Sequence, residues 1–272
     1  PNQPKRKGDL RTRRAPRLAE GTHKVQIAKY PFDRGAVRVA FHARILVKGS
    51  WKPYVVKQFL EPKNQTKTEV LSTLEVSSVT KFLAEEWMRT EGHDGPTVEC
   101  IEARALVVHR DGAPVWYNLE GLLSGKFVKW TNNYGWAEPE APVLLRFSKW
   151  THDWSDGFVM VTDLQGAKDT GAYVLTDPAV LCKDLARFKP TNFEPGQFIM
   201  CLEAVDHALN SGVVSLRPGA KKHVTTYMPG FTKPKPMPTP TMPTKTPSDG
   251  APPSFKRSHP WHAHDLALSS LT

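Results

Sequence analysis

Stretches in which apolar and polar residues alternate open the foldable part of this chain. Segments 37–49 and 51–59 are rich in β-branched and aromatic residues, and Gly49 and Ser50 lie between them. Such alternation predicts strands, and the small residues predict a turn. We therefore expect a pair of strands within the region 24–59.

A different period follows between residues 68 and 92. Apolar residues recur there every three or four positions, which is the spacing of one helix face; they are Val70, Leu71, Leu74, Val79, Phe82, Leu83 and Trp87. Asn64 or Thr68 is a candidate cap for the start of this helix, and Gly92 for its end. The pattern predicts one long helix.

The remaining foldable chain mixes both periods. Strand-like runs at 98–110 and 114–123 flank the turn signal Asp111-Gly112. A further strand is expected at 158–166, and helices are expected near 143–151 and over 197–212. This order predicts a mixed α+β fold and not a repeating βαβ pattern.

The two ends of the chain differ in composition from this region. Residues 1–21 are dense in Lys and Arg, and residues 228–272 are dominated by Pro, Thr and Lys without an apolar period. We expect a disordered basic arm and a disordered tail, because neither segment can bury enough apolar surface to fold. A short helix is expected near 259–272, and we interpret His259, His262 and His264 as a fortuitous cluster and not a metal site.

Composition restricts the classes of protein that this chain can represent. With 272 residues, 39% hydrophobic content and 8 Trp it can bury a sizeable core, and no apolar run has the length of a membrane span. The scattered Cys100, Cys182 and Cys201 are typical of a reducing compartment. We therefore expect a cytoplasmic location, with the basic arm leaving a nuclear one open.

The net charge of +10 raises the alternative of a nucleic-acid-binding protein. That alternative requires aromatic and basic residues interleaved on one sheet face. The Trp residues are instead scattered through predicted helices and loops, and much of the charge lies in the two ends. No specific nucleic-acid partner is expected.

Charged residues in and after apolar strands are the first candidates for chemistry. Lys57 interrupts the apolar run 54–59; such a lysine is most often simply exposed, but it can also neutralise phosphate oxygens from a rigid strand. Upstream, Gly35-Ala36 would let the backbone approach a ligand closely. Each signal alone is weak.

Carboxylates follow a second apolar strand. Asp163 and Gln165 come two positions apart after the run FVMV, and residues two apart on an extended chain point the same way. Asp177 supplies a second carboxylate, although a turn residue before Pro178 is its ordinary interpretation. Together with a lysine, these groups would suffice for phosphoryl transfer assisted by Mg²⁺.

Four segments together resemble the alpha-kinase family of atypical protein kinases: 31–40 (PFDRGAVRVA), 54–59 (YVVKQF), 117–135 (YNLEGLLSGKFVKWTNNYG) and 160–178 (MVTDLQGAKDTGAYVLTDP). The resemblance covers about residues 30–216. It implies a two-lobed, protein-kinase-like α+β fold with an ATP cleft between a β-rich N-terminal lobe, 22–118, and a mixed C-terminal lobe, 119–227. It also implies ATP and Mg²⁺ as cofactors and a protein substrate with a Ser or Thr acceptor, and it leaves the oligomeric state open.

The resemblance further implies roles for individual residues. Lys57 matches the lysine that contacts the ATP phosphates, and Asp163 matches the catalytic aspartate that positions the incoming hydroxyl. Gln165 and Asp177 match the pair that holds Mg²⁺. Gly35 and Arg38 match the loop near the phosphates, and Glu120 matches the hinge at the adenine end. Lys129 matches another nucleotide contact, in a motif that Asn133 and Gly135 complete. Thr176 precedes the Mg²⁺ ligand Asp177, and Glu75 resembles the family's helix glutamate.

The chain departs from the family at its structural zinc site. The family pattern His-x-Cys-x-x-x-Cys is reduced to His207, with Leu209 and Val213 at the cysteine positions, and the earlier histidine is Lys149. His152 lies nearby but out of register. One ligand cannot make a tetrahedral site, so no structural zinc is expected.

A second departure lies in the loop that helps the family to seat its peptide substrate. Asn192 and Gly196 persist there, but two expected glycines are Lys189 and Glu194. The expected function is still an ATP-dependent serine/threonine protein kinase, because the catalytic set is intact. An ATP-binding pseudokinase or scaffold is the alternative, and a basic nucleic-acid-binding protein comes after it.

Overall fold

A computed structural model describes residues 21, 23–91, 95–136, 141–169, 171–192 and 194–210, together with the backbone of 261–264 and 268–270. The predicted basic arm, apart from Gly21, and most of the predicted tail lie outside these residues. Within them, no helix combines the length and the apolar character needed to cross a membrane.

One half of the molecule is an antiparallel sheet in the order β13-β1-β3-β4-β7-β6-β14, with β2 paired to β3; all but β13 and β14 come from the first 121 residues. Its bounds are β1 (Val25–Ala28), β2 (Asp33–Arg34), β3 (Arg38–Val47), β4 (Ser50–Phe59), β6 (Arg104–Arg110), β7 (Ala113–Gly121), β13 (Trp261–His264) and β14 (Leu268–Ser270). The hairpin expected around Gly49-Ser50 is confirmed, with Val47 opposite Ser50.

The helix predicted near 259–272 is wrong. β13 pairs with β1, and β14 pairs with β6, so these segments complete the two edges of the sheet. An open sheet edge presents unpaired N–H and C=O groups. The backbone of the C-terminal segments bonds to these groups in extended form, and a helix as short as 259–272 has little cooperativity to compete with that pairing.

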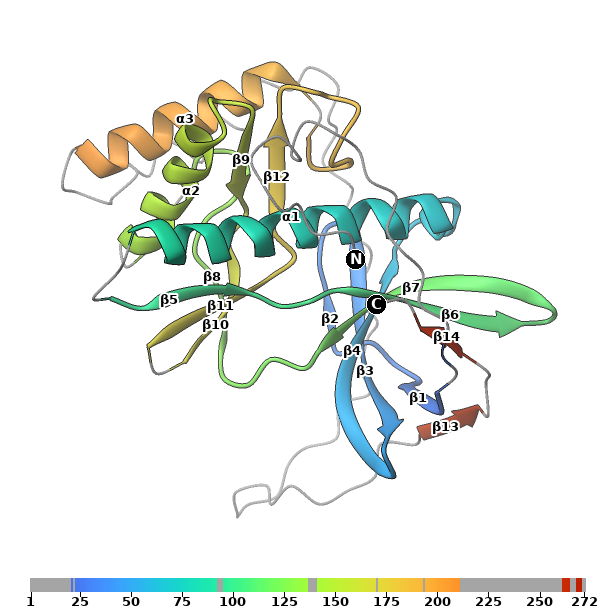
Figure 1. Ribbon diagram of the computed structural model, residues 1–272. Helices are drawn as coiled ribbons and strands as arrows, with labels where there is room; N and C mark the ends of the chain where they lie inside the picture. Colours follow the sequence, from blue (N-terminus) through green and yellow to red (C-terminus); the bar gives the residue numbers. More distant parts are fainter. Residues whose placement is uncertain are drawn as a thin grey trace, which may run out of the picture.

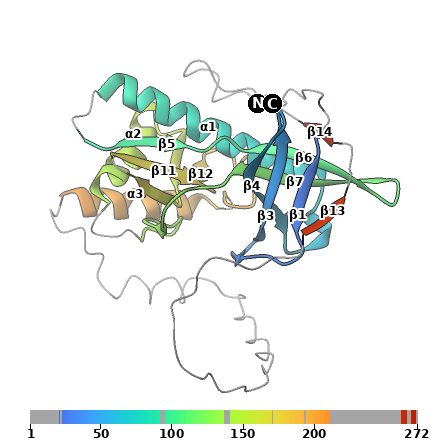
Figure 2. The same ribbon diagram turned by 90° about the horizontal axis from the view of Figure 1, so that it is seen from below.

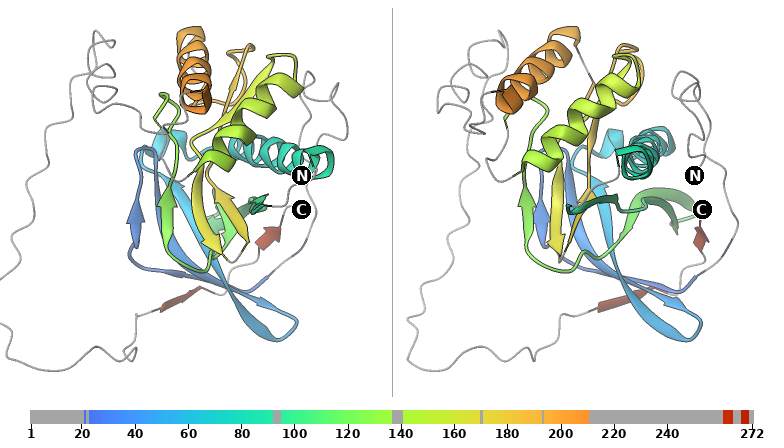
Figure 3. Two further views of the ribbon diagram at one scale, coloured as in Figure 1. Left: turned by 90° about the vertical axis from the view of Figure 1, so that its left-hand side faces the viewer. Right: turned by 60° about the vertical axis from the view of Figure 1, so that its left-hand side comes forward.

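The other half of the molecule, formed mainly by the C-terminal part of the chain, is built from smaller sheets and two helices. β5 (Thr97–Cys100), β11 (Ala172–Thr176), β10 (Gln165–Asp169) and β8 (Phe127–Lys129) form one sheet, and β12 (Ala179–Cys182) pairs with β9 (Val159–Thr162). The helices α2 (Pro142–Trp154) and α3 (Pro195–Asn210) pack through a cluster that includes Leu145, Cys201 and Val205. Figure 3 shows these helices at the end of the molecule away from the β3–β4 hairpin.

Two predicted strands are each divided in the structure. The run 98–110 becomes β5 and β6, and β5 leaves the first sheet to pair in parallel with β11. The run 158–166 becomes β9 and β10, which belong to different sheets. Continuous apolar sequence does not reveal such crossings, because both parts of each run are strands with buried residues.

The long helix α1 (Lys67–Glu91) joins the two halves of the molecule, as Figures 1 and 2 show. Val70 and Leu74, in its first half, pack with Phe59 and Ala105 of the first sheet. Its second half packs on the C-terminal half, and the ring centroid of Trp87 lies 5.3 Å from that of Phe147 in α2. The two lobes are therefore braced by one continuous element.

Candidate active site

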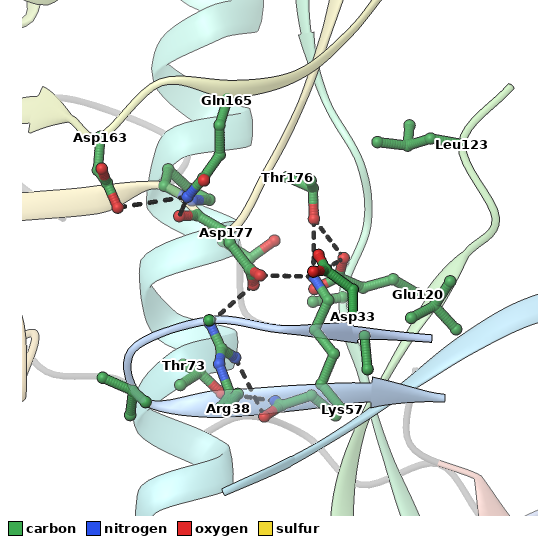
Figure 4. Close-up of a pocket in the computed structure, with 18 of the residues that line it drawn as sticks. Asp33, Arg38, Lys57, Thr73, Glu120, Leu123, Asp163, Gln165, Thr176 and Asp177 are labelled. Atoms are coloured by element: carbon green, nitrogen blue, oxygen red, sulfur yellow. Dashed lines mark hydrogen bonds and ion pairs between the residues drawn. The ribbon is translucent and has the colours of Figure 1, made fainter. Parts of the chain in front are cut away.

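A cleft of about 630 Å³ opens between the two halves. β3, β4, β7 and α1 line one side, and β8, β10, the turn after β9, the end of β11 and the loop before α3 line the other. The charged and polar side chains that face one another across it include Arg38, Lys57, Glu120, Lys129, Asp163, Gln165, Thr176 and Asp177. Figure 4 shows most of these groups directed toward one another.

The register of the first sheet places its charged side chains on one face. Lys57 lies opposite Ala40 on β3 and opposite Asn118 on β7. Arg38 is two residues from Ala40, and Glu120 is two residues from Asn118. Because side chains two apart share a face, all four polar groups project into the cleft.

Lys57 is buried, with 7% of its surface exposed, and its ammonium group has three oxygen partners. Its Nζ lies 2.6 Å from Oε2 of Glu120 and 2.8 Å from Oδ2 of Asp177, and it donates to Oγ1 of Thr176 at 2.9 Å. Thr176 Oγ1 in turn donates to the same oxygen of Glu120. A buried ammonium needs such partners, so this is a fixed cation and not an exposed strand lysine.

Arg38 is the second cation on this side of the cleft. Its Nη2 lies 2.7 Å from Oδ1 of Asp177, and its Nη1 donates to Oδ1 of Asn118 at 3.4 Å. Asn118 is fully buried and also donates to Thr73 Oγ1 of α1. Sequence reasoning did not single out Asn118, whose only signal is a polar residue two positions before Glu120 in an apolar strand.

Asp163 and Asp177 lie where the chain passes between the two C-terminal sheets. Asp163 connects β9 to β10, Asp177 connects β11 to β12, and both have left-handed backbone conformations, with φ of 54° and 49°. Non-glycine residues rarely adopt this conformation, and it concentrates at functional sites. The two turns lie beside each other because Thr162 pairs with Ala179 and Gln165 pairs with Thr176.

The expectation that an extended chain aligns Asp163 with Gln165 is wrong, because the backbone turns at Asp163. The two side chains nevertheless meet. Gln165 Nε2 donates to Oδ2 of Asp163 at 3.3 Å and to the backbone oxygen of Asp177 at 3.0 Å. The amide therefore joins the two carboxylate turns.

Gly166 is required by this turn. Its φ is 152°, and a Cβ atom at this position would lie 2.0 Å from the backbone oxygen of Val174. β10 and β11 approach so closely here that only glycine fits. The glycine of the segment MVTDLQG thus serves strand pairing directly and the position of Gln165 indirectly.

The two aspartates differ in their electrostatics. Burial alone would raise the pKa of Asp177, but Arg38 and Lys57 outweigh it and hold the pKa at about 2. Burial raises the pKa of Asp163 above its ordinary value despite Lys129, whose Nζ lies 2.6 Å from Oδ1. The Asp177 carboxyl is therefore ionised at neutral pH, whereas Asp163 is the stronger base of the two.

Glu75, which the resemblance suggests as the helix glutamate, does not contact Lys57. Glu75 contacts Arg187 instead, and the carboxylates beside Lys57 are those of Glu120 and Asp177. Gly35 lines the cleft, and its N–H donates to the backbone oxygen of Arg38 at 2.9 Å.

The structure does not bring the predicted substrate-loop residues Asn192 and Gly196 to the cleft. Asn192 is buried, its side-chain oxygen accepts the N–H of Cys182, and it organises the loop from within. Gly196 lies in the first turn of α3. The neighbouring residues that line the cleft are Lys189, Pro190 and Thr191, and a loop without periodicity gave no signal for which of its residues face inward.

The residues at the family's zinc positions do not suit a metal. Lys149, an ammonium that cannot coordinate, lies 2.7 Å from Oδ1 of Asp153 and 3.6 Å from Oδ1 of Asp206. Leu209 packs beside the Leu145 cluster, and Val213 lies outside the described residues. No cluster of three or more potential metal-ligating side chains occurs in the part of the chain that the structure describes.

Comparison with known proteins identifies the family of this chain. The profile of the alpha-kinase family matches residues 33–204, which is most of the described chain. The chain belongs to the alpha-kinase family. The match begins before Arg38 and extends beyond Asp177, so it includes every charged group of the cleft.

The sequence identity between this chain and individual alpha-kinases is low. Alpha-protein kinase vwkA of Dictyostelium discoideum is 28% identical over 190 residues, which cover 66% of this chain and 29% of the relative. The elongation factor 2 kinase of Rattus norvegicus is 28% identical over 200 residues, covering 68% of this chain and 26% of that protein. The chain thus spans less than a third of the length of these curated relatives.

Solved alpha-kinase structures share the fold. An alpha kinase from Entamoeba histolytica superposes with a TM-score of 0.57 at 22% identity, covering 65% of this chain and 72% of that one. The alpha-kinase domain of myosin heavy chain kinase A in complex with ADP gives a TM-score of 0.57 at 17% identity, covering 72% and 98%. The predicted two-lobed, mixed α+β fold is confirmed.

Proposed function

We propose that this alpha-kinase domain transfers the γ-phosphate of ATP to the hydroxyl of a serine or threonine in another protein. The observation that carries this proposal is the convergence of two cations and three oxygen-bearing groups on one cleft. Arg38 and Lys57 enter from the first sheet, and Asp163, Gln165 and Asp177 enter from the turns of the other half. Phosphoryl transfer depends on such positioning and charge stabilisation more than on covalent chemistry by the protein.

The first lobe supplies the groups that suit phosphate oxygens. Lys57 is held by Glu120 and Thr176, and Arg38 by Asn118 and Asp177. Neither side chain has to be ordered when a nucleotide binds, so little conformational entropy is lost. Glu120 and Gly121 lie where β7 leaves the first sheet, which suits the adenine end of the cleft.

The donor set fits Mg²⁺, which prefers oxygen ligands from carboxylates, amides and phosphates. Asp177, with its low pKa, and the amide oxygen of Gln165 would hold the ion. When bound, Mg²⁺ would neutralise charge on the phosphate groups. The same donor set would not hold zinc selectively, since it lacks nitrogen and sulfur ligands.

Asp163 is the residue suited to the acceptor. Its raised pKa makes it a better base than an ordinary aspartate, and Lys129 and Gln165 fix its orientation. In the reaction the acceptor oxygen forms a bond to the γ-phosphorus while the bond to the β-phosphate oxygen breaks, and ADP leaves. Asp163 orients the acceptor hydroxyl and takes up its proton.

Intact-mass spectrometry tests this function. The chain would be incubated with Mg²⁺, ATP and myelin basic protein, beside the Lys57→Ala variant. Additions of phosphate to the acceptor by the native chain, absent with the variant, support the proposal. Nucleotide binding without phosphate on either protein would instead support the pseudokinase alternative.

A further inference from the structure

The loop between β12 and α3 forms one wall of the cleft. Lys189, Pro190 and Thr191 line the same space as Lys57, Asp163 and Asp177. On the opposing side, α1 lines it with Thr73, Val76 and Ser77. The relative position of this loop and α1 therefore sets the width of the cleft at that end.

A buried ion pair joins these two walls. The guanidinium of Arg187 lies with its Nη2 2.5 Å and its Nε 3.1 Å from Oε1 of Glu75 in α1. The Arg187 side chain is only 3% exposed, whereas that of Glu75 is 22% exposed. Two donors of one guanidinium on a carboxylate define orientation as well as distance.

The loop beyond Arg187 is held in an unfavourable conformation. Phe188 is fully buried with a φ of 58°, which is rare for a bulky residue. Such strain persists only where surrounding contacts over-determine it, and it concentrates at functional sites. Arg187 stacks over the Phe188 ring at 4.5 Å, and Ser72 Oγ of α1 donates to the backbone oxygen of Lys189 at 3.3 Å.

Glu75 also lies at a particular point of α1. Leu74 belongs to the cluster on the first sheet, while Val76 belongs to the core of the other half. The Glu75 carboxylate thus projects from α1 at the point where the helix passes from one lobe to the other. A contact made there transmits the position of the first lobe to the loop.

We propose that Glu75, acting through Arg187, is a positioning residue that holds the wall formed by residues 189–191 at the distance needed by the acceptor protein. The inference rests on the proposed kinase function and adds a determinant of acceptor binding to it. It assigns Glu75 no contact with the nucleotide, whose phosphate-binding cations have Glu120, Thr176 and Asp177 as partners.

The test compares Glu75→Gln with Glu86→Gln. Glu86 lies in the same helix and pairs with Arg89, whose side chain is 67% exposed. The Glu86→Gln variant therefore controls for the loss of a helix glutamate away from the cleft. Glu75→Gln keeps the shape and one hydrogen bond but removes the charge. We expect its KM for myelin basic protein to rise about 10-fold or more, with the KM for ATP within about twofold of the native value.

A second measurement does not depend on catalysis. The N–H groups of Arg187, Thr191 and Asn192 bond to backbone oxygens within the loop, so their hydrogen exchange reports its order. Glu75→Gln should exchange these amides at least about 10-fold faster than the native chain and Glu86→Gln. The double variant Glu75→Met with Arg187→Met removes both charges together and avoids leaving one buried alone.

The outcomes separate the two proposals. If the native chain phosphorylates no acceptor, the kinase function fails, while hydrogen exchange still tests the pair. If exchange of residues 187–192 is unchanged in Glu75→Gln, or if the double variant keeps the native KM for the acceptor, the positioning role is overturned. An equal rise of both KM values would also overturn it, because the effect would then be general.

Discussion

Lys57 Nζ lies 2.8 Å from Oδ2 of Asp177, so a strand of the first sheet and a turn of the other half meet through one ion pair. Arg38 binds the second oxygen of the same carboxylate at 2.7 Å. Glu120 also pairs with Lys57, so this cluster holds two cations and two carboxylates, whose charges balance one another at the point where we place the phosphates. The groups therefore serve both the closure of the lobes and the proposed chemistry.

The low pKa of Asp177 predicts a pH dependence of stability. A carboxyl whose pKa is lowered on folding stabilises the fold above its unfolded pKa, and this stabilisation is lost as the pH falls through the folded value of about 2. We expect the difference in unfolding free energy between the native chain and Asp177→Asn to shrink by roughly 2 kcal/mol between pH 6 and pH 2. Urea unfolding at both pH values measures it, and a constant difference would contradict the role of the carboxylate charge.

The raised pKa of Asp163 predicts a pH dependence of stability that is opposite to that of Asp177. The pKa of Asp163 is raised by burial, so its ionisation above that pKa opposes folding. Asp163→Asn should therefore be more stable than the native chain at pH 7, and this advantage should vanish near pH 3, where the carboxyl is protonated in both folded and unfolded states. Thermal unfolding at the two pH values checks this, and lower stability at pH 7 would show that the ion pair with Lys129 outweighs the burial.

Thr176 predicts a defect in nucleotide binding. Its hydroxyl accepts from Lys57 and donates to Glu120, and its replacement by Val keeps the shape but leaves both charges without that bond. We expect Thr176→Val to weaken binding of Mg-ATP by roughly 10-fold, the equivalent of about 1.4 kcal/mol. Thr176→Ser retains the hydroxyl and should bind like the native chain; calorimetric titration compares the three.

Gly166 predicts a large cost in stability. Alanine there would bring Cβ to 2.0 Å from the Val174 backbone oxygen, so β10 and β11 would have to separate. Gly166→Ala should lose roughly 3 kcal/mol or more of unfolding free energy. Gly171, at the turn of the same hairpin, has a φ of 84° but no atom within 4 Å of an added Cβ, so Gly171→Ala should lose only about 1 kcal/mol. Equal losses would show that backbone strain, and not the close approach, decides the effect.

Sequence alone predicts much of this architecture because periodicity is strong where one face of an element is buried. α1, α2 and α3 lie within a few residues of their predicted bounds, and the β3–β4 hairpin follows its turn signal. The crossings at 101–103 and 163–164 were not predictable in this way. They depend on which sheet each half of an apolar run joins, and this is decided by tertiary packing.

Sequence patterns likewise reveal some residues of the candidate site and miss others. Lys57, Asp163, Gln165 and Asp177 were found because the segments around them carry family patterns, and the structure brings them to one cleft. The partners Asn118 and Arg187 were missed, since each is a single polar residue whose contact lies far away in the chain. The segment around Asn192 predicts a contact with the acceptor, whereas the hydrogen bonds of its side chain fix the loop from inside.

The most direct measurement of the central claim is the rate of ³²P transfer from γ-labelled ATP to myelin basic protein by the native chain and by Asp163→Asn, with the affinity for Mg-ATP measured on the same samples. The arrangement predicts that the variant binds Mg-ATP with an affinity close to the native value and transfers phosphate at least about 100-fold more slowly. Transfer by Asp163→Asn at the native rate would contradict the assignment of this cleft as a phosphotransfer site centred on Asp163.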